Sequence, residues 1–367
     1  MRKLASIQVI SDITPILGAD MIETASVLGW SVVIAKKDKF KVGDKVVYCE
    51  IDSILPDRPE FEFLRERKFR VRTIKLKKQV SQGICFPLSV LPKGNYNEGD
   101  DVTDVLGVVK YDPQAEVEKR LSDERMLVHK NRIDKFLKRY TWYRSFIKPS
   151  RLPFPSFIKK TDEDRIQLFP WICTKHVDTV FEVSEKVDGQ SATYFLIKNP
   201  VSWQRWFKPY LFGVCSRNFQ LLKADNSSYW DIANRLNIKE SLSGLMRFIG
   251  RKGGCDRIIL QGEIIGPKIQ GNKYRRTSNE FYAFNLFFDD EQCDNRLLFE
   301  NMEAMDLKTV PLLNDMKLAP TIKENLELAN GKSRLSDTLR EGLVLRNYQL
   351  GLSFKIVSPE FLLKHEE

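Results

Sequence analysis

The chain has 367 residues, 42% of them apolar, so it is longer than most single domains and can bury two cores. Its 59 lysines and arginines against 49 aspartates and glutamates give a formal charge of +10, which suits a polyanionic partner without identifying one. Six scattered cysteines, no C-x-x-C pair and only three histidines argue for reduced thiols and against structural zinc. No stretch approaches the roughly 18 apolar residues of a membrane span. We therefore expect a cytoplasmic protein with no membrane partner.

Residues 1–112 contain short apolar runs, rich in Val, Ile and aromatics, that are separated by turn formers such as Gly43-Asp44 and Gly99-Asp100. This pattern is typical of a small antiparallel barrel, and we expect an OB-like domain that binds nucleic acid. Residues 68–72 alternate basic and apolar side chains, which predicts a strand with one inward face and one positive face. The positive face is either a nucleic-acid contact or an ordinary solvated surface, and the sequence leaves both open.

Residues 113–160 have a different character. Apolar residues recur at helical spacing between positions 133 and 147 beside a series of lysines and arginines, which predicts an amphipathic basic helix. The segment ends in a proline-interrupted stretch, residues 149–155, which we interpret as part of a linker. The helix either packs on a neighbouring domain, which we favour, or contacts RNA directly.

Residues 161–367 mix strand-like runs with helical stretches near 229–250 and 299–308, without regular β-α-β alternation. This predicts a second domain of the α+β class, built on antiparallel sheets. Within it, residues 203–210 combine aromatic and basic side chains. They could stack on unpaired bases or form an insertion hairpin packed on the domain. We favour packing.

The segment that points to chemistry is Lys186-Val187-Asp188-Gly189, placed directly after a predicted strand. A lone K-x-D-G usually means a surface turn. Here five further segments follow in a fixed order: Ser216-Arg217-Asn218, Gln261 to Pro267, Phe281 to Asn285, Glu341 to Arg346 and Ser353 to Ile356.

In this order the six segments resemble motifs I, Ia, III, IIIa, IV and V of the covalent nucleotidyltransferases, which comprise DNA ligases, RNA ligases and mRNA capping enzymes. RNA ligases are the nearest resemblance, because residues 266–272 are similar to RNA ligases of the nick-sealing type. The predicted barrel also precedes the motifs, and only residues 356–367 remain from the end of motif V onward. That arrangement resembles the branch of RNA ligases with an N-terminal OB domain.

The resemblance implies an ATP-dependent RNA ligase that joins RNA 3′-OH and 5′-phosphate ends. The intermediates would be lysyl-AMP and a 5′-adenylylated polynucleotide, and the role would be nick-sealing RNA repair by a monomer acting on RNA, including nicked duplex. The alternatives are a DNA ligase or capping-type nucleotidyltransferase, or an inactive nucleic-acid-binding relative.

The resemblance also implies roles for individual residues. Lys186 is the nucleophile and Lys355 binds the α-phosphate, while Phe284, or else Phe281, stacks on adenine. The remaining expected contacts to ATP come from Glu185, Ser191, Arg217 and Glu341, with a further polar contact from Gln190. Motif V departs from the pattern, because Val357 stands where many relatives have a second lysine. That role is either vacant or taken by Lys364.

Lysine chemistry further implies a metal. A free lysine has a pKa near 10.4, yet only the unprotonated amine attacks phosphorus. Asp188, Glu263 and Glu341, if clustered around Lys186, would raise its pKa rather than lower it. A divalent cation among them would reverse the local sign of the charge. We therefore expect Mg²⁺ or Mn²⁺ at these three carboxylates, held partly through water.

Overall fold

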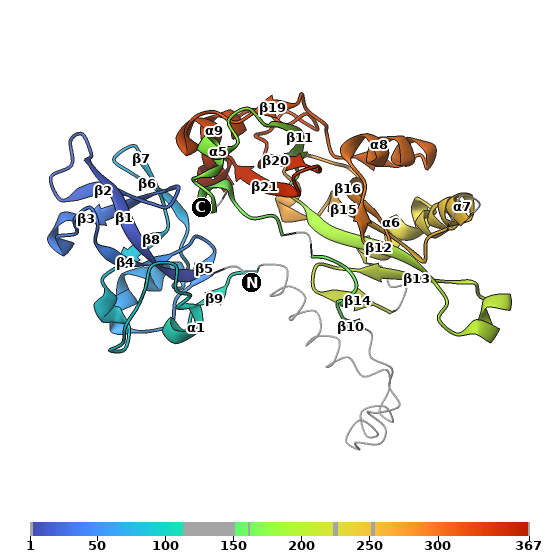
Figure 1. Cartoon of the computed structure of the whole chain (residues 1–367), viewed down its shortest axis with the longest axis horizontal. Coiled ribbons are helices and arrows are strands. Elements are labelled where there is room, and N and C mark those ends of the chain that lie inside the picture. The colour runs from blue at the N-terminus through green and yellow to red at the C-terminus, as the bar shows by residue number, and fades with distance from the viewer. Residues whose placement is uncertain (1–2, 113–150, 161, 223–226, 251–253, 366–367) are drawn as a thin grey trace, which may run out of the picture.

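The computed structural model describes residues 3–112, 151–160, 162–222, 227–250 and 254–365. Two sheet-rich regions lie side by side in Figure 1, a barrel drawn in blue to cyan and a larger α+β region drawn in green to red. The basic helix expected between residues 130 and 147 lies outside the described residues.

The first region is an antiparallel sheet in the order β3-β2-β1-β4-β8, curled so that β3 lies beside β8. Alternation explains its inward face, because Trp30, Val32 and Ile34 of β3 are buried in turn. The strands are β1 (Ala5–Pro15), β2 (Ile22–Val27), β3 (Trp30–Ala35), β4 (Lys45–Cys49) and β8 (Ile84–Phe86). The predicted antiparallel barrel is therefore present.

Shorter elements complete the barrel. Strand β5 pairs with β9, and β6 forms a hairpin with β7. Their bounds, with those of the short helices, are β5 (Ser53–Ile54), β6 (Thr73–Leu76), β7 (Gln79–Gln82), β9 (Val109–Lys110), η1 (Lys36–Asp38), η2 (Pro59–Arg67), η3 (Leu88–Val90) and α1 (Thr103–Leu106).

The expected strand over residues 68–72 is wrong. Lys68 and Phe69 follow η2 with φ of 51° and 58°, a left-handed conformation that no strand adopts, and β6 begins only at Thr73. There is consequently no positive strand face here. Arg70 turns inward instead, pairing with Asp52 and lying 3.7 Å from the centre of the Tyr111 ring.

The second region contains two sheets. The larger runs β10-β14-β13-β12-β15-β16-β17, with β18 parallel to β16, and the smaller runs β19-β11-β20-β21. The larger comprises β10 (Arg151–Pro153), β12 (Gln190–Lys198), β13 (Tyr210–Cys215), β14 (Phe219–Leu221), β15 (Arg257–Ile265), β16 (Glu280–Phe288), β17 (Glu291–Gln292) and β18 (Lys308–Thr309). The smaller comprises β11 (Val180–Lys186), β19 (Met316–Lys317), β20 (Gly342–Asn347) and β21 (Leu352–Val357).

Helices cover these sheets. Apolar side chains of α6, α7 and α8 form one core with the larger sheet, while α5 and α9 contribute to a second core with the smaller one. The bounds are α5 (Ile172–Lys175), α6 (Ser228–Arg235), α7 (Ile238–Gly250), α8 (Asn295–Ala304), α9 (Ile322–Ala329) and α10 (Pro359–His365), with η4 (Ile166–Leu168), η5 (Ser202–Trp206) and η6 (Gln270–Asn272). The helical stretches expected near 229–250 and 299–308 are thus present with shifted bounds.

Two sequence expectations about connecting segments are wrong. The proline-interrupted stretch contributes β10, which pairs with β14 rather than serving only as a linker. The aromatic segment between β12 and β13 does not pack on the domain, because Trp206 and Phe207 are 88% and 86% exposed. In Figure 1 the loop between these strands projects from the end of the larger sheet.

The barrel and the second region are packed against each other. Val357 of β21 and Phe361 and Leu362 of α10 belong to the barrel core, which ties the C-terminal helix to the N-terminal sheet. Gly29, in the β2–β3 turn, donates its N–H to the Gln167 carbonyl at 2.9 Å. A Cβ on Gly29 would lie 2.8 Å from the Gln167 Cα, so only glycine permits this approach.

The cysteines agree with the compositional expectation. All six cysteines are buried and unpaired, as expected of reduced thiols. Among the helices that the structure describes, none has both the length and the apolar content needed to cross a bilayer.

Candidate active site

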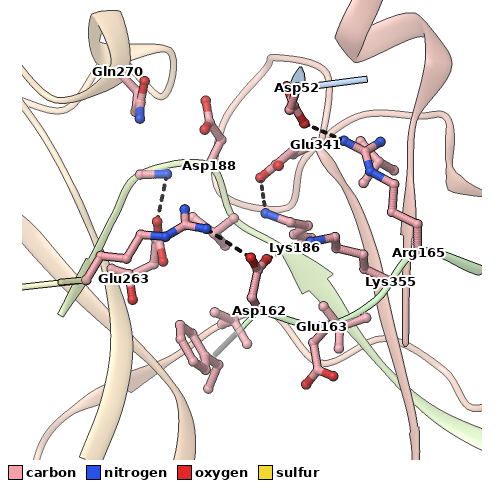
Figure 2. A pocket seen from close by; sticks show the side chains of 18 of the residues that line it. Asp52, Asp162, Glu163, Arg165, Lys186, Asp188, Glu263, Gln270, Glu341 and Lys355 are labelled. Atoms are coloured by element: carbon pink, nitrogen blue, oxygen red, sulfur yellow. Dashed lines mark hydrogen bonds and ion pairs between the residues drawn. The ribbon is translucent and has the colours of Figure 1, made fainter. Parts of the chain in front are cut away.

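A cavity of about 700 Å³ lies where the barrel meets both sheets of the second region. Side chains from all of these elements line it, and Figure 2 shows acidic and basic groups alternating around its interior. The cavity is lined by Lys186 and Lys355 and by seven other residues that we expected at the site: Glu185, Asp188, Ser191, Arg217, Glu263, Phe284 and Glu341. Gln190, Phe281 and Lys364, named as further or alternative contacts, do not line it.

Lys186 ends β11, and its ammonium lies 2.7 Å from the Glu341 carboxylate, directly before β20. Pairing of β11 with β20 sets Lys186 opposite Gly342, which places the two charged neighbours together. The lysine and glutamate side chains are 26% and 15% exposed, so the pair is largely shielded but open to the cavity. Figure 2 shows the Lys186 amine directed at Glu341.

Close packing explains why the K-x-D-G segment has glycine at position 189. A Cβ on Gly189 would lie 2.4 Å from the Ile264 carbonyl oxygen of β15. The Gly189 N–H also donates to Glu263 Oε1 at 3.1 Å. Only glycine at this position therefore lets the segment approach β15 closely enough for Glu263 to lie beside Lys186.

Three carboxylates control the charge of Lys186. Burial alone would lower the pKa of Lys186, but Glu341, Glu263 and Asp188 together outweigh burial and raise this pKa above its ordinary value. Burial also raises the pKa of Glu263 to about 8, against the opposing charge of Lys186 and with the help of Glu341. Without a bound cation, Lys186 therefore stays protonated at neutral pH.

This acidic group suits a divalent cation. Lys186 pairs with Glu341 and Lys273 pairs with Asp188, whereas Glu263 accepts a hydrogen bond from the Gly189 N–H and has an elevated pKa. Carboxylate oxygens are the ligands that Mg²⁺ prefers. In the part of the chain that the structure describes, no three Asp, Glu, His or Cys side chains converge enough to hold a metal by themselves. The three expected carboxylates thus surround the lysine, and a cation among them would need water as additional ligands.

Two further cations of the cavity contact a single carboxylate. The Lys355 ammonium lies 3.0 Å from Asp162 Oδ1, and the Arg217 guanidinium lies 3.2 Å from Asp162 Oδ2. Lys355 comes from β21, and Arg217 lies in the turn between β13 and β14. Both residues expected to contact the nucleotide thus line the cavity, beside an acidic neighbour that no sequence motif indicated.

The aromatic alternative is decided by strand geometry. Phe281 of β16 is 2% exposed and packs edge-on against Tyr194 in the domain core. Phe284 is half-buried and lines the cavity. Gln261 and the adjacent Gly262 of β15 pair with Asn285 and Ala283 of β16, so Phe284 is the extra residue at an irregularity in β16. Phe284, not Phe281, is the aromatic side chain placed to meet a ligand.

Other expected contacts are engaged with the protein itself. The Glu185 carboxylate accepts hydrogen bonds from the Ser333 hydroxyl at 2.5 Å and the Arg334 N–H at 2.8 Å. Gln190 bonds to the side chains of Tyr229 and Ser228, and it is not among the residues lining the cavity. These two residues therefore position β11 and β12 rather than offering free groups to a ligand.

The departure in motif V has a structural reason. Val357 is 2% exposed and packs into the barrel core, where a lysine would bury an unpaired charge. Lys364 is exposed and does not line the cavity, so it does not replace the missing lysine. Lys273, which the motif reasoning missed, lines the cavity and forms an ion pair with Asp188.

The barrel supplies a further group that sequence motifs could not locate. Arg70, Arg72, Lys110 and Tyr111 line the cavity together with Asp52. Asp52 also pairs with Arg165 of the second region at 3.2 Å. Positive charge is present in all of these segments of the sequence, but nothing in their spacing shows that they face the K-x-D-G lysine.

A two-sheet antiparallel domain whose cavity holds a shielded lysine among carboxylates, further cations and an aromatic side chain has the features of a covalent nucleotidyltransferase, here carrying an N-terminal barrel. The comparisons agree. An OB-fold domain profile matches residues 4–88, and an RNA ligase profile matches residues 179–357. No curated protein shows a significant match to the chain.

Solved structures of Naegleria gruberi RNA ligase resemble the chain over nearly its whole length. A form with pyrophosphate is 31% identical, with a TM-score of 0.78 and coverage of 100% of this chain and 99% of that chain. A mutant with AMP and Mn is 31% identical, with a TM-score of 0.79 and coverage of 100% of this chain and 99% of that chain. A mutant with ATP and Mn is 30% identical, with a TM-score of 0.77 and coverage of 99% of both chains. The chain therefore belongs to the RNA ligase family, in the branch with an N-terminal OB domain, and it is an ATP-dependent RNA ligase.

Proposed function

We propose that this ligase works as a monomer that seals nicks in RNA duplexes, through a lysyl-AMP on Lys186 and a 5′-adenylylated RNA. The observation that carries the proposal is the 2.7 Å contact between the Lys186 amine and Glu341 in a cavity that Lys355 and Arg217 also line. All of these groups come from one chain.

In the first step the Lys186 nitrogen attacks the α-phosphorus of ATP. An N–P bond forms, the bond from phosphorus to the bridging oxygen breaks, and pyrophosphate leaves with the bonding electrons. The lysine must first lose a proton, and Glu341 accepts a hydrogen bond from its ammonium and so offers a path for that proton. Lys355 lines the same cavity, and its charge would stabilise the added negative charge on the transferring phosphate.

The proposed nucleotide-binding groups are those that line the cavity. Phe284 offers a half-buried ring for the adenine, and Arg217 offers a planar set of donors for phosphate or ribose oxygens. Ser191 lines the same wall beside Glu263 in the β12–β15 register. Structures of the Naegleria gruberi ligase with ATP and Mn, and with AMP and Mn, support a nucleotide and a metal in this class of site.

Mg²⁺ or Mn²⁺ would be held by Glu263 and Glu341, and through water by Asp188. Its positive charge would lower the pKa of Lys186 and offset charge on the phosphate. The protein residues themselves orient the lysine, through Glu341, and the K-x-D-G turn, through the Gly189 N–H bond to Glu263.

In the later steps the AMP passes from lysine to an RNA 5′-phosphate, and a 3′-hydroxyl oxygen then attacks that phosphate and releases AMP. Support for RNA comes from the family, and support for nick sealing comes from the resemblance of residues 266–272 to nick-sealing ligases. The barrel adds Arg70, Arg72 and Lys110 beside the cavity, where polyanion backbones would meet them.

The test uses full-length protein, ATP labelled at the α-phosphate and Mg²⁺ or Mn²⁺. Covalent label on the protein that maps to Lys186 is expected. A chase with three substrates then separates the alternatives: a nicked RNA duplex, single-stranded RNA and a nicked DNA duplex. Transfer and sealing on the RNA nick support the proposal, whereas preference for the DNA nick or for single strands contradicts its substrate. Failure to label would contradict the lysyl-AMP mechanism itself.

A further inference from the structure

Asp162 lines the same cavity as Lys186, and both side chains are labelled in Figure 2. Its Oδ2 lies 2.5 Å from the Lys110 ammonium and 3.2 Å from the Arg217 guanidinium, while its Oδ1 lies 3.0 Å from the Lys355 ammonium. One carboxylate thus contacts three cations, one from the barrel side and two from the transferase sheets. A phosphate group has the same sign of charge and the same kind of acceptor oxygens.

The neighbouring residues hold Asp162 on a short strap, residues 162–165, that runs alongside β21. The Lys355 N–H donates to the Asp164 carbonyl at 2.8 Å, and Arg165 forms an isolated parallel bridge with Lys355. Glu163 pairs with Arg346 of β20 at 3.1 Å, and Arg165 pairs with Asp52 of the barrel at 3.2 Å. The strap therefore fixes its backbone to the transferase sheet, while its side chains reach both domains.

The geometry points to Asp162 as an internal phosphate surrogate: it holds Lys110, Arg217 and Lys355 together in the nucleotide-free enzyme and must yield these cations to the phosphates of ATP. This inference rests on the proposed function, because it assumes that the nucleotide phosphates meet Lys355 and Arg217. It goes further by assigning a competing anion inside the protein.

The electrostatics explain why the contact forms and why it can be replaced. Burial alone would raise the pKa of Asp162, but Lys355, Lys110 and Arg217 outweigh it, so the carboxylate stays ionised. Asp162 is 38% exposed, and Lys110 and Arg217 are 36% and 35% exposed. Solvent reaches three of the four groups, so the cluster can open without first exposing a dry core.

Two consequences follow for the reaction cycle. The observed affinity for ATP equals the intrinsic affinity multiplied by the fraction of molecules in which the cations are released from Asp162. Binding of the phosphates also breaks the Lys110–Asp162 contact, which is a direct tie between barrel and transferase domain. Occupancy of the nucleotide site is thereby coupled to the freedom of the barrel. When pyrophosphate leaves, Asp162 can return to the cations and oppose its rebinding.

The test measures ATP binding in protein that cannot react, Lys186→Ala, with and without Asp162→Asn. Calorimetry with ATP is carried out in buffer with EDTA and again with Mn²⁺. If Asp162 holds the cations in about nine molecules of ten, the substitution tightens ATP binding about tenfold in EDTA. Pyrophosphate should gain affinity by a similar factor. Asp290→Asn is the matched control, because Asp290 forms an ion pair with Arg257 elsewhere and gives the same change of net charge.

Unchanged or weaker ATP binding by Asp162→Asn in EDTA overturns the inference. Loss of binding only with Mn²⁺ also overturns it and makes Asp162 a metal-dependent nucleotide contact. If the variant fails to fold, hydrogen exchange of the Lys186→Ala protein decides: ATP should reduce protection of the peptide spanning 162–165, and unchanged or higher protection contradicts the surrogate. If one of these results overturns the inference but Lys186 of the unsubstituted enzyme is labelled normally, the proposed function is not contradicted. Absence of ATP binding in every protein contradicts the proposed function instead.

Discussion

The Lys186 ammonium and the Glu341 carboxylate form an ion pair at 2.7 Å although the two residues are 155 positions apart. The pairing of β11 with β20 produces this contact, and it places the proposed nucleophile against its proposed proton acceptor. The predicted reactivity of the lysine and its predicted requirement for an added cation both rest on this arrangement.

Replacing Lys186 with alanine should abolish covalent AMP labelling and leave the fold intact, because its end of β11 faces the cavity. Lys186→Arg should fail as well, since arginine keeps its proton in proteins and cannot attack. The measurement is labelling with α-labelled ATP, beside circular dichroism of each variant. If either folded variant is labelled as strongly as the unsubstituted enzyme, another residue is the nucleophile.

Removal of divalent metal should stop Lys186 labelling at neutral pH, because the three nearby carboxylates raise the pKa of the lysine. With metal present, the labelling rate should increase with pH until the lowered pKa is passed and then level off. The measurement is the initial labelling rate between pH 6 and 9 in Mg²⁺, in Mn²⁺ and in EDTA. A rate indifferent to EDTA would contradict the metal requirement.

Glu263→Gln should make the metal-free protein more resistant to urea at pH 8 and about equal at pH 5. The folded pKa of Glu263 is about 8, above its ordinary value of 4.5, so the native state binds more protons than the unfolded state. Its contribution to stability is therefore complete below pH 4.5 and is lost as the pH rises through 8.

Glutamine avoids this titration and keeps an oxygen for the Gly189 N–H. We expect a difference of a few kcal/mol in the free energy of unfolding at pH 8, since the pKa of Glu263 rises from 4.5 to about 8 on folding and one pKa unit corresponds to about 1.4 kcal/mol. Equal pH profiles for the two proteins would show that Glu263 is not held in a protonated state.

Gly29→Ala should destabilise the contact between the barrel and the transferase domain, because its Cβ would lie 2.8 Å from the Gln167 Cα. Overpacking of this kind costs about 1 to 3 kcal/mol. Gly244→Ala is the control, since a Cβ there meets nothing within 4 Å and alanine favours the helix. Urea unfolding of both variants gives the comparison. Equal stability would mean that the β2–β3 turn does not bear on Gln167 in solution.

Alanine at both Trp206 and Phe207 should change the free energy of unfolding by no more than about 0.5 kcal/mol, because both side chains are largely exposed. Trp30→Ala is the contrast, since Trp30 is 1% exposed in the barrel core and its loss should cost about 3 to 5 kcal/mol. Thermal and urea unfolding measure both. A large loss in the double variant would restore the packed-hairpin interpretation that the sequence favoured.

The sequence by itself predicted the class of chemistry, because Lys186, Asp188, Glu263, Glu341 and Lys355 stand in an ordered set of short segments that resemble the motifs of covalent nucleotidyltransferases. It also determined the α+β class and the N-terminal barrel, since alternation of buried and exposed residues within a strand is a local property.

Only the tertiary structure decided which charges meet. The alternation of basic and apolar residues at 68–72 is compatible with a strand and with a turn. Only the positive φ angles of Lys68 and Phe69 exclude the strand. Glu185 looks like a ligand beside the nucleophile until the fold brings Ser333 and Arg334 onto its carboxylate. Asp162 and Lys110 are 52 positions apart and belong to no motif. Contacts of this kind depend on how two domains pack, and ion pairs between distant residues leave no period or spacing in the sequence.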